Sequence, residues 1–383
     1  MQHTVRRGAS GGNAFATCAR RGSAAYGIVQ RLCDATRSYQ IGSLPEIFGQ
    51  PDFDNHEMVL AFWDERARLK GFVAVHSTAL GPAFGGCRMW PYVDEAAAVR
   101  DVLRLSRGMS YKNAMAGLPY GGGKAVIMAD ARSDKTPALF QAFGRAINRM
   151  GGAYITAEDV GISVADMRLV AEVSDHVGGI PQDDGGYRGG DPSPLTAQGV
   201  FTGMQATAKA AFGTQDLAGK VVAVQGVGHV GYNLCKLLHD AGAKLKVSDI
   251  NADNLARAKA EFGAEIVDPK TFYETAADII APCALGGVLS KTSIPLIQAQ
   301  VIAGAANNQL ATEADGDRLQ DRGILYAPDY VINAGGIISV SAERDDAATQ
   351  ATVQAQIARI GDRLTEIYAH SKTSGRPPHE VAD

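Results

Sequence analysis

The amino-acid sequence predicts an α/β protein with two domains, the second of them built on a doubly wound parallel sheet. Three observations lead to this prediction. The chain has 383 residues, which is more than one hydrophobic core usually organises. After residue 220, short Val- and Ile-rich segments alternate with helical patterns, as in a parallel sheet covered by helices on both faces. A glycine-rich turn directly follows the first of these segments.

In the first half of the chain, the pattern of hydrophobic residues predicts strands and helices in mixed order. Apolar runs after Glu57 and after Lys70 are typical of two strands joined by a turn, and Asp94 is a good N-cap for a helix. Gly151 and Gly152 are expected to end a later helix. The expected elements are strands at 58–63 and 71–76, a helix from 94 through 105, a strand at 125–128, and helices at 137–150 and 166–173.

In the second half, a long helix rich in small residues precedes the alternating strands and helices. The stretch 181–192 is rich in Gly, Asp and Pro, so we expect a domain boundary near it. The expected domains are 44–190, joined by the C-terminal helical segment 345–383, and 191–344. The expected elements are helices at 196–212, 229–241, 252–262 and 346–371, and strands at 221–225, 244–248, 278–281, 300–303 and 324–326.

Residues 1–43 differ from the rest, because they carry several Arg and no acidic residue before Asp34. We expect a disordered tail or a start-site artefact, with a targeting segment as the alternative. The net charge of the chain is −4, and no apolar run reaches the ~20 residues of a membrane span. We therefore expect no nucleic-acid partner and no membrane. The five Cys include no C-x-x-C pair and there is no H-E-x-x-H motif, so the prediction is a cytoplasmic protein without disulfides or a metal.

The glycine-rich turn lies between a buried-strand pattern at 221–225 and a helical one, with the spacing G-x-G-x-x-G. In a dinucleotide-binding turn, the first Gly permits the tight turn and the second lets the backbone approach a pyrophosphate. The third lets helix and strand pack closely. The alternative is a purely structural turn. The residues expected to contact the cofactor are Gly226, Val227, Gly228, His229, Val230 and Gly231.

Asp249 ends the next predicted strand, about 20 residues beyond the turn. A carboxylate at this place bonds the ribose 2′-OH and repels a 2′-phosphate, and Ile250 and Asn251 bring no cation to offset the repulsion. The sequence therefore predicts NAD rather than NADP. We expect His229 to be a solvent-facing helix residue rather than a catalytic one.

Lys112, Lys124 and Asp159 each lie in glycine-rich company that is typical of an active site. A Lys ammonium that is buried beside another cation has a lowered pKa, which prepares it for proton transfer near neutral pH. A turn-rich Ala-Gly-Leu-Pro stretch separates the two lysines, and such a loop is able to bring both to one pocket. The alternatives are two surface lysines and a helix N-cap at Asp159, a role for which Asp166 competes.

Longer motifs surround these residues: 109–127, TAEDVG at 156–161, DPSPLTA at 191–197, APCALGG at 281–287 and YAPDYVINAGG at 326–336. Together with the glycine turn, they resemble the motifs of the Glu/Leu/Phe/Val dehydrogenase family. The resemblance runs in order over roughly residues 45 to 383 and is strongest to the leucine-specific members, with the phenylalanine and valine members next. It implies an α/β substrate and oligomerisation domain and a Rossmann-type NAD-binding domain, separated by a cleft.

The resemblance also assigns chemistry to matching residues. Lys112 would hold the α-carboxylate of the substrate, and Lys124, with its low pKa, would activate water and polarise the carbonyl or imine. Asp159 would shuttle the proton of the amino group, and Asn308 would reach the substrate or the nicotinamide. The implied reaction is reversible oxidative deamination of an L-amino acid by NAD, which releases the 2-oxo acid and ammonia. Further implied cofactor contacts are Thr196, Cys283 and Ala284.

Where glutamate dehydrogenases carry a lysine for the distal carboxylate, this chain has Phe84. Burying a glutamate side chain against an aromatic ring without a cation costs several kcal/mol, so we do not expect glutamate as substrate. Phe84 and Ile337 are bulkier than the residues typical of leucine-specific members, which makes the pocket smaller and favours valine or isoleucine beside leucine. Phenylalanine is the alternative, because Phe84 could stack on an aromatic substrate. The residues expected to line this side of the substrate are Phe84, Gly85, Met109, Ala157, Ile337 and Val340.

Two other functions stay open on the residues alone: a cofactor-binding protein without turnover, and a dehydrogenase for 2-hydroxy acids. The second usually needs a His–carboxylate pair, and none of the eight His lies in a comparable motif. The family likeness implies a homo-oligomer. The resemblance also implies that relatives continue further at the C-terminus, a segment that often contributes to oligomer assembly.

Overall fold

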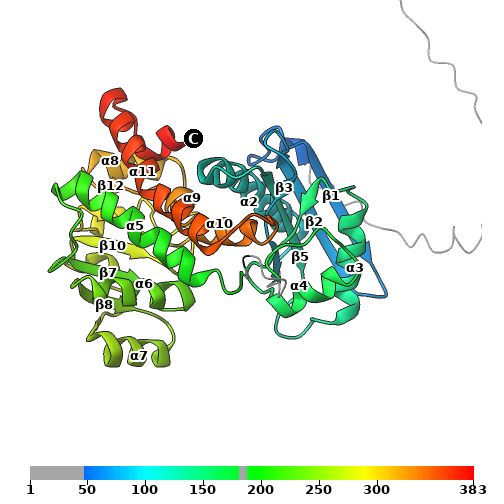
Figure 1. The fold of residues 1–383 in the computed structure, drawn as a ribbon, viewed down its shortest axis with the longest axis horizontal. Helices are drawn as coiled ribbons and strands as arrows, with labels where there is room; N and C mark the ends of the chain where they lie inside the picture. Colours follow the sequence, from blue (N-terminus) through cyan, green and yellow to red (C-terminus); the bar gives the residue numbers. More distant parts are fainter. Residues whose placement is uncertain (1–46, 181–186, 188) are drawn as a thin grey trace, which may run out of the picture. The chain divides into compact units, whose positions relative to one another are not determined.

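A computed structural model of the chain describes residues 47–180, 187 and 189–383 (Figure 1). The expected tail 1–43, and most of the expected linker at 181–192, lie outside the described residues. No helix in the described part of the chain is long and apolar enough to cross a membrane.

The first sheet is mixed, with the order β1-β2-β5-β3-β6 and β4 paired beside β5. Strands β1, β2 and β5 are antiparallel neighbours, whereas β3 and β4 run parallel to β5. The expected strands at 58–63, 71–76 and 125–128 are confirmed, and β3, β4 and β6 were missed because they are only two to four residues long. The strands are β1 (Met58–Asp64), β2 (Leu69–Ser77), β3 (Ala83–Phe84), β4 (Cys87–Trp90), β5 (Gly121–Met128) and β6 (Tyr154–Ile155).

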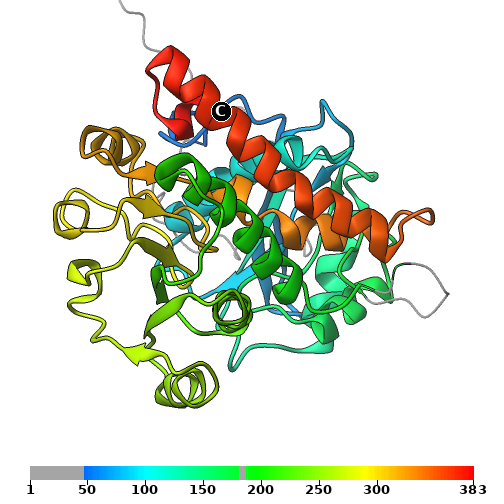
Figure 2. The same ribbon diagram turned by 60° about the vertical axis from the view of Figure 1, so that its left-hand side comes forward.

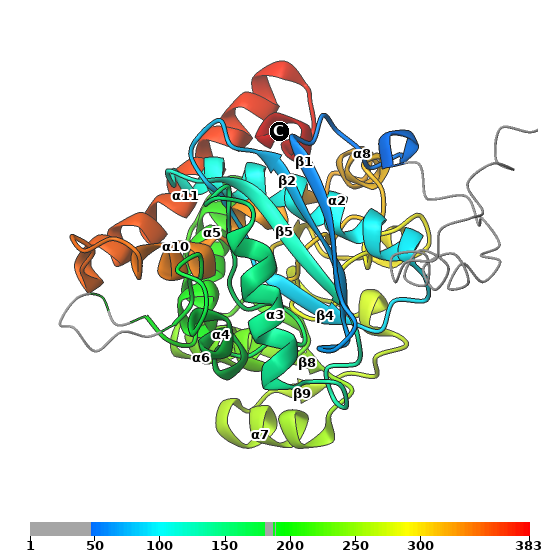
Figure 3. The ribbon, with the colours of Figure 1, turned by 90° about the vertical axis from the view of Figure 1, so that its right-hand side faces the viewer.

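Helices cover both faces of this sheet, as Figure 3 shows, with α3 (Pro137–Asn148) in front and α2 (Glu95–Ala116) behind. The alternation of β2 explains the arrangement, because Val73 and Val75 pack in the α3 cluster while Phe72 and Ala74 pack with α2. A third helix, α4 (Val164–Ala171), contacts α3. The turn η1 (Ile47–Gly49) precedes the sheet.

Helix α2 begins where the sequence predicts, since the side chain of Asp94 accepts a hydrogen bond from the N–H of Ala97 at 2.7 Å. It runs well beyond the expected end at Leu105 and stops at Gly117, whose φ of 65° is the left-handed conformation of a C-cap. The predicted end of this helix at Leu105 is therefore wrong, and Lys112 lies on the last turns of α2. The interior Gly108 did not end the helix, because a glycine there costs only about 1 kcal/mol.

Strand β5 packs closely against α2, and glycine makes this possible. A Cβ at Gly122 would overlap the backbone of Ser106 and Ser110 on α2. The first three residues of β5 are all glycine and buried. Lys124 follows them on β5, so the expected turn between the two site lysines joins α2 to β5, two elements that pack against each other.

At helix α4, neither Asp159 nor Asp166 is the N-cap. The N-cap of α4 is Ser163, and Asp166 is the third helical residue, whose carboxylate accepts from the N–H of Ser163 at 2.8 Å. Such a capping box satisfies two free backbone donors at once. Asp159 is left without a capping function at this helix.

The second sheet is a parallel sheet with the order β12-β11-β10-β7-β8-β9, which confirms the doubly wound α/β prediction (Figures 1 and 2). Its chain order reverses between β7 and β10, the place where such sheets bind ligands. The strands are β7 (Val221–Gln225), β8 (Lys244–Ser248), β9 (Glu265–Ile266), β10 (Ile279–Pro282), β11 (Val301–Ile302) and β12 (Leu325–Tyr326).

Two clusters of apolar side chains cover the two faces of this sheet, one containing Val222 and Ile279 and the other Ala223 and Ile280. The helices and short turns of this half are α5 (Ser193–Phe212), α6 (His229–Asp240), α7 (Ala252–Phe262), η2 (Phe272–Glu274), η3 (Ile294–Leu296), α8 (Ala314–Asp321), α9 (Asp329–Ile332), α10 (Gly335–Ala342), α11 (Gln350–Ser374) and α12 (Pro378–Ala382).

The long helix α11 packs along α5 (Figure 2). Its Ile360 lies where a Cβ on Gly199 of α5 would come within 2.8 Å, so the two helices approach closely. Ile357 and Leu364 of α11 belong to the same apolar cluster as Val222 of the second sheet. The C-terminal segment thus shares its core with the second sheet.

Candidate functional site

The ammonium of Lys124 and the carboxylate of Asp159 form a shielded ion pair. Nζ of Lys124 lies 3.1 Å from Oδ2 of Asp159, and the lysine is only 5% exposed. Asp159 follows β6 in a loop that runs beside β4, where the N–H of Cys87 donates to the carbonyl of Ala157 at 2.8 Å. The structure therefore brings together a strand residue and a loop residue that the sequence separates widely.

A second cation contacts the same carboxylate. Nε of Arg88, on β4, donates to Oδ2 of Asp159 at 3.0 Å. Burial raises the pKa of Asp159, but the charges of Lys124 and Arg88 outweigh burial and hold this pKa at about 2. The carboxylate is therefore ionised at any pH at which the protein works.

Lys112 reaches across to the second half of the chain. Its Nζ donates to Oδ1 of Asn307 at 2.8 Å. Burial lowers the pKa of Lys112 to about 8; the Asp329 carboxylate opposes this effect and the Lys124 ammonium adds to it. The side chain remains charged at neutral pH and ready to bind an anion.

The residues expected beside the substrate side chain do lie together. Phe84, Ala157 and Val340 are buried in one apolar cluster with Ile155, and Ile337 packs against it. The ring of Phe84 lies 5.0 Å from that of Tyr120, centroid to centroid. Met109 is close by, because a Cβ placed on Gly85 would come within 3.0 Å of its Cγ. The side chains of this cluster are all apolar.

The glycine turn has the shape that a dinucleotide needs. Gly226 has a φ of 91°, and a Cβ on Gly231 would overlap the carbonyl of Gly226, so strand and helix are in contact. A Cβ on Gly228 would meet no atom of the described chain within 4 Å, which leaves room above the turn. Helix α6 begins at His229, so its free N–H groups face that room. These residues fit a pyrophosphate.

Asp249 binds back to the turn, since its Oδ2 accepts from the N–H of Val227 at 2.6 Å. Ala284 lies against Gly226, and the N–H of Cys283 donates to the carbonyl of Gln225 at 2.7 Å. Burial raises the pKa of Cys283 to about 12, so this thiol is not a nucleophile at neutral pH. The expected cofactor residues of β7, β8 and β10 therefore meet at one edge of the sheet.

Comparison with known proteins places the chain in a family. Residues 59–176 match the model "Glu/Leu/Phe/Val dehydrogenase, dimerisation domain", and 185–253 and 246–376 match "Glutamate/Leucine/Phenylalanine/Valine dehydrogenase". The chain belongs to the Glu/Leu/Phe/Val dehydrogenase family. It is 50% identical to a leucine dehydrogenase of Geobacillus stearothermophilus, over 88% of this chain and 91% of that relative.

Other members of the Glu/Leu/Phe/Val dehydrogenase family are nearly as similar. A valine dehydrogenase of Streptomyces virginiae is 46% identical, over 87% of this chain and 93% of the relative. The crystal structure of an L-tryptophan dehydrogenase from Nostoc punctiforme matches with a TM-score of 0.72 and 42% identity, over 86% of this chain and 93% of that chain. The relatives thus differ in the side chain of the amino acid for which they are named.

The roles expected for Asn308 and Thr196 stay predictions, and the structure adds the contacts of these residues within the chain. Asn308, at a φ of 52°, accepts from the N–H of Gly287 through its carbonyl, and its neighbour Asn307 is the one that binds Lys112. Thr196 on α5 donates to the carbonyl of Pro192 at 2.9 Å and lies over Gly336 of α10. His229 is exposed, as the sequence predicts.

Sequence reasoning missed four residues of the site. They are Arg88, Asn307, Asp329 and Asn333. Nδ2 of Asn333 donates to Oδ1 of Asn307 at 2.8 Å, and Asp329 is buried and accepts from the N–H of Gln309 at 2.7 Å. Asp329 and Asn333 stand inside the motif at 326–336, Asn307 adjoins Asn308, and Arg88 lies shortly after Phe84. Only the folded structure shows which of these residues lie near Lys112 or Asp159.

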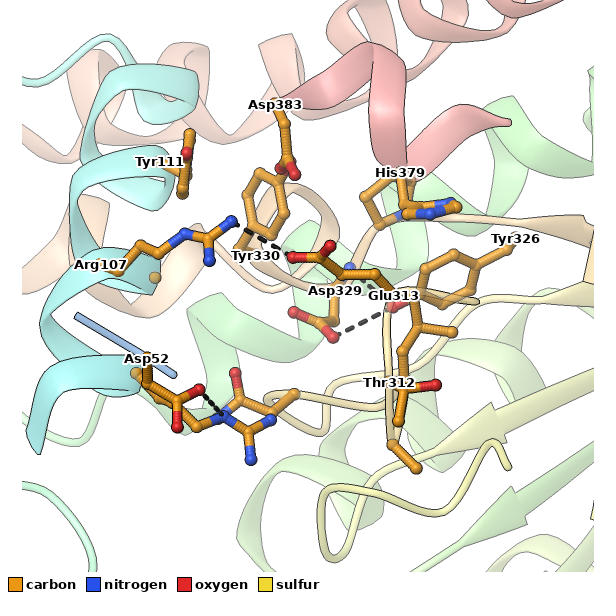
Figure 4. Close-up of a pocket in the computed structure, with 16 residues that line it drawn as sticks. Asp52, Arg107, Tyr111, Thr312, Glu313, Tyr326, Asp329, Tyr330, His379 and Asp383 are labelled. Carbon is orange, nitrogen blue, oxygen red and sulfur yellow. Dashed lines mark hydrogen bonds and ion pairs between the residues drawn. The ribbon is translucent and has the colours of Figure 1, made fainter. Parts of the chain in front are cut away.

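A cavity of about 370 Å³ lies beside the Lys112 end of the site (Figure 4). It is lined by residues of α2, α9 and α12 together with Asn308 and Asp329. Its arginines already have carboxylate partners, because Arg107 lies 3.3 Å from Glu313 and Arg104 lies 3.7 Å from Asp52. Tyr111 and Asn308, the chain neighbours of Lys112 and Asn307, line the cavity, whereas Lys112, Lys124 and Asp159 themselves do not.

Proposed function

We propose that the chain is an NAD-dependent dehydrogenase that oxidatively deaminates leucine, valine or isoleucine to the 2-oxo acid and ammonia, and runs in reverse as well. Membership of the family makes it an amino-acid dehydrogenase that acts on a CH–NH2 group with a nicotinamide cofactor. The single observation that carries the mechanism is the shielded pair of Lys124 and Asp159, at 3.1 Å.

In this proposal Lys112 binds the substrate carboxylate. Its ammonium is charged at neutral pH, and its bond to Asn307 orients it from the second half of the chain. A carboxylate held by one fixed cation turns Cα toward Lys124 and Asp159, which gives the orientation that a bimolecular step otherwise lacks.

Asp159 and Lys124 move protons. The ionised carboxylate of Asp159 takes a proton from the substrate amino group, so that the free amine is the species oxidised. Lys124 then polarises the imine carbon–nitrogen bond and directs a water molecule to that carbon. The carbinolamine that forms loses ammonia, and the 2-oxo acid leaves. When bound, the nicotinamide ring accepts the hydride that leaves Cα.

The choice of NAD over NADP is part of the proposal and rests on Asp249. The residues that would hold the dinucleotide are those of the glycine turn, with Ala284 and Cys283 beside them. A 2′-phosphate near the Asp249 carboxylate would be repelled, and the adjacent Ile250, which is fully exposed, offers no compensating charge.

Substitution of Asp249 tests this choice. Since Asp249 also accepts from Val227, Asp249→Asn keeps an acceptor and removes the charge. We expect Asp249→Asn to raise the ratio of kcat/KM with NADP to that with NAD, by tenfold or more, with NAD affinity falling less than in Asp249→Ala. An unchanged ratio in both variants would mean that another residue excludes NADP.

The apolar side-chain cluster supports a hydrophobic substrate. Glutamate is disfavoured, because its distal carboxylate would lie against Phe84 and Val340 without a cation. The aromatic pair of Phe84 and Tyr120 supports phenylalanine as the second candidate, since an aromatic side chain would pack well on it.

Three coarser proposals accompany the reaction. A homo-oligomer is supported by the description of the model that matches residues 59–176, which names a dimerisation domain. A cytoplasmic location is supported by the free thiols Cys87, Cys235 and Cys283. We also propose that the chain divides into domains 44–190 and 191–344, with 345–383 joined to the first. The packing of α11 on α5 links this C-terminal segment to the second half as well.

A panel of substrates tests the function directly. The purified chain is mixed at alkaline pH with NAD or NADP and each of the common L-amino acids, and the absorbance of reduced nicotinamide is followed. We expect turnover with leucine, valine and isoleucine and little with glutamate. D-leucine and 2-hydroxy-4-methylpentanoate serve as controls. The proposal would be overturned if the hydroxy acid supported reduction of the cofactor and none of the amino acids did.

A further inference from the structure

The guanidinium of Arg88 binds two carboxylates at once. Its Nε donates to Oδ2 of Asp159 and its Nη1 donates to Oδ2 of Asp101, both at 3.0 Å. The side chains of Arg88 and Asp159 are 19% and 17% exposed, so this ion pair is largely shielded from water. A planar guanidinium held at two of its nitrogens fixes the direction of a contact as well as its charge.

The backbone sets this contact. The loop after β6 runs alongside β4, where the N–H of Cys87 donates to Ala157 and the N–H of Met89 donates to Val160. These two hydrogen bonds flank Arg88 on one side and Asp159 on the other. The register between β4 and the loop after β6 therefore places the side chains of Arg88 and Asp159 next to each other.

The far end of Arg88 is anchored as well. Asp101 lies on α2, and its Oδ2 also accepts from the hydroxyl of Tyr92 at 2.5 Å. Burial lowers the pKa of Arg88, but the negative charges of Asp159 and Asp101 outweigh burial and raise this pKa above its ordinary value. A chain of contacts thus runs from Tyr92 through Asp101 and Arg88 to Asp159.

Lys124 and Arg88 reach the same oxygen of Asp159, but only one of them is suited to hold it. In the proposed reaction the ammonium of Lys124 takes part in proton transfer, and while it is neutral it cannot keep Asp159 ionised. A guanidinium keeps its proton throughout. Both cations contact Oδ2, so among the described residues Oδ1 is available to a substrate amino group.

We propose that Arg88 is a positioning residue of the dehydrogenase reaction, which holds Oδ2 of Asp159 so that the charged carboxylate presents Oδ1 to the substrate amino group. The inference rests on the proposed function. Arg88 acts through Asp159 and exchanges no proton with the substrate.

The test compares Arg88→Gln, Arg88→Lys and Asp101→Asn with the unaltered chain in reductive amination of 4-methyl-2-oxopentanoate from pH 5 to pH 9. Each kcat/KM is divided by that of the unaltered chain at the same pH, which cancels the titration of ammonia. We expect the ratio for Arg88→Gln to be one tenth or less at pH 9 and to fall by up to about a further twofold at pH 5. Without the guanidinium, the pKa of Asp159 rises by ~1–3 units, so protonation of Asp159 begins at higher pH.

The other two variants separate charge from direction. Arg88→Lys keeps a cation that reaches only one carboxylate, so we expect its ratio to be low but nearly independent of pH. Asp101→Asn leaves the Nε bond in place and removes an anion near Asp159; we expect a several-fold loss without the decline toward pH 5. Arg132→Gln, which breaks the exposed pair of Arg132 and Asp130, is the matched control and should keep a ratio near one at all pH values.

Two results would overturn the inference. One is a ratio for Arg88→Gln within twofold of one at both pH 5 and pH 9. The other is an equal, pH-independent loss in Arg88→Gln and Arg88→Lys, which would indicate general damage to the fold; melting temperature and NAD binding are measured on both to identify it. Failure of the proposed function gives a different result, because the unaltered chain itself would then show no amination of the oxo acid.

Discussion

At the scale of single residues, three charged groups share a site that excludes most water. Burying a lysine beside another lysine is unfavourable, and it is tolerated here because Asp159 binds Lys124 and Asn307 binds Lys112. The carboxylate in turn has two cations on one oxygen, so removing one of them leaves it paired with the other. We therefore expect the carboxylate to keep one cationic partner when Lys124 or Arg88 is replaced singly.

Replacement of Lys124 is the first such test. We expect Lys124→Ala to lower kcat by ~10²–10⁴-fold, the usual contribution of a positioned acid–base group, while NAD affinity stays within a few-fold, because the glycine turn is untouched. Steady-state kinetics and NAD titration by fluorescence check this. Lys135→Ala is the control, since it removes another lysine bound to a carboxylate, that of Asp166. Turnover close to that of the unaltered chain would exclude the assigned role of Lys124.

Phe84 is the residue on which side-chain preference should turn. We expect Phe84→Leu to raise the ratio of kcat/KM for leucine to that for valine several-fold, because the smaller side chain leaves space in the cluster with Ile155 and Val340. The effect is bounded by the ~1–3 kcal/mol that one methylene is worth in such a pocket. Phe143→Leu, an equal loss of volume in another buried cluster, should leave the ratio unchanged. A constant ratio in Phe84→Leu would place the substrate side chain elsewhere.

At the scale of elements, the sequence predicted the long strands and helices but not how they end. The alternating pattern of β2 and the buried run of β7 are strong because many residues contribute to each. Strands β3 and β6, with two residues each, carry no period, and they exist because β5 offers a partner to β3 and β3 in turn offers one to β6. The predicted end of α2 was wrong, since Gly117 and not Gly108 has the left-handed backbone that ends a helix.

The same limit explains which site residues could be predicted. Lys112, Lys124 and Asp159 were found because their local motifs are distinctive. Asn307 was missed beside the predicted Asn308, since a loop pattern does not tell which of two adjacent side chains contacts Lys112. Arg88 stands on a strand too short to predict, and its partner lies 71 positions away in the sequence.

The contact of β5 with α2 gives a prediction at this scale. Gly122→Ala should destabilise the fold by ~1–3 kcal/mol, because the added methyl overlaps the backbone of α2 and forces strand and helix apart. Lys112 and Lys124 should separate with them, so KM for the amino acid should rise. Thermal unfolding and steady-state kinetics measure both effects.

Gly108→Ala is the matched control for Gly122→Ala. Gly108 lies on α2, the helix against which Gly122 packs, and its new methyl would meet no described atom within 4 Å. We expect it to stabilise the protein by ~0.5–1 kcal/mol, the helix preference of Ala over Gly. If the two variants change the melting temperature equally, close packing does not set the distance between β5 and α2.

At the scale of the whole molecule, the electrostatics of the site depend on both sheets. Lys112 comes from a helix on the first sheet, whereas Asn307 and Asp329 come from loops and a helix beside the second. Burial between the two halves is the largest cause of its lowered pKa, and Asp329 is the largest opposing charge. The charge that binds the substrate carboxylate is therefore a property of the assembled site and not of α2 alone.

This dependence predicts how substrate binding changes with pH. The pKa of Lys112 in the folded protein is about 8, below that of an ordinary lysine, so the ammonium is present below pH 8 and is lost as pH rises through that value. We expect the inhibition constant of 4-methylpentanoate, whose own carboxyl group is ionised throughout this range, to be constant from pH 6 to near pH 8 and then to rise about tenfold per pH unit. Lys112→Arg should remove the rise, because a guanidinium stays charged. An inhibition constant that is flat up to pH 10 in the unaltered chain would show that Lys112 keeps its proton, or that another cation holds the carboxylate.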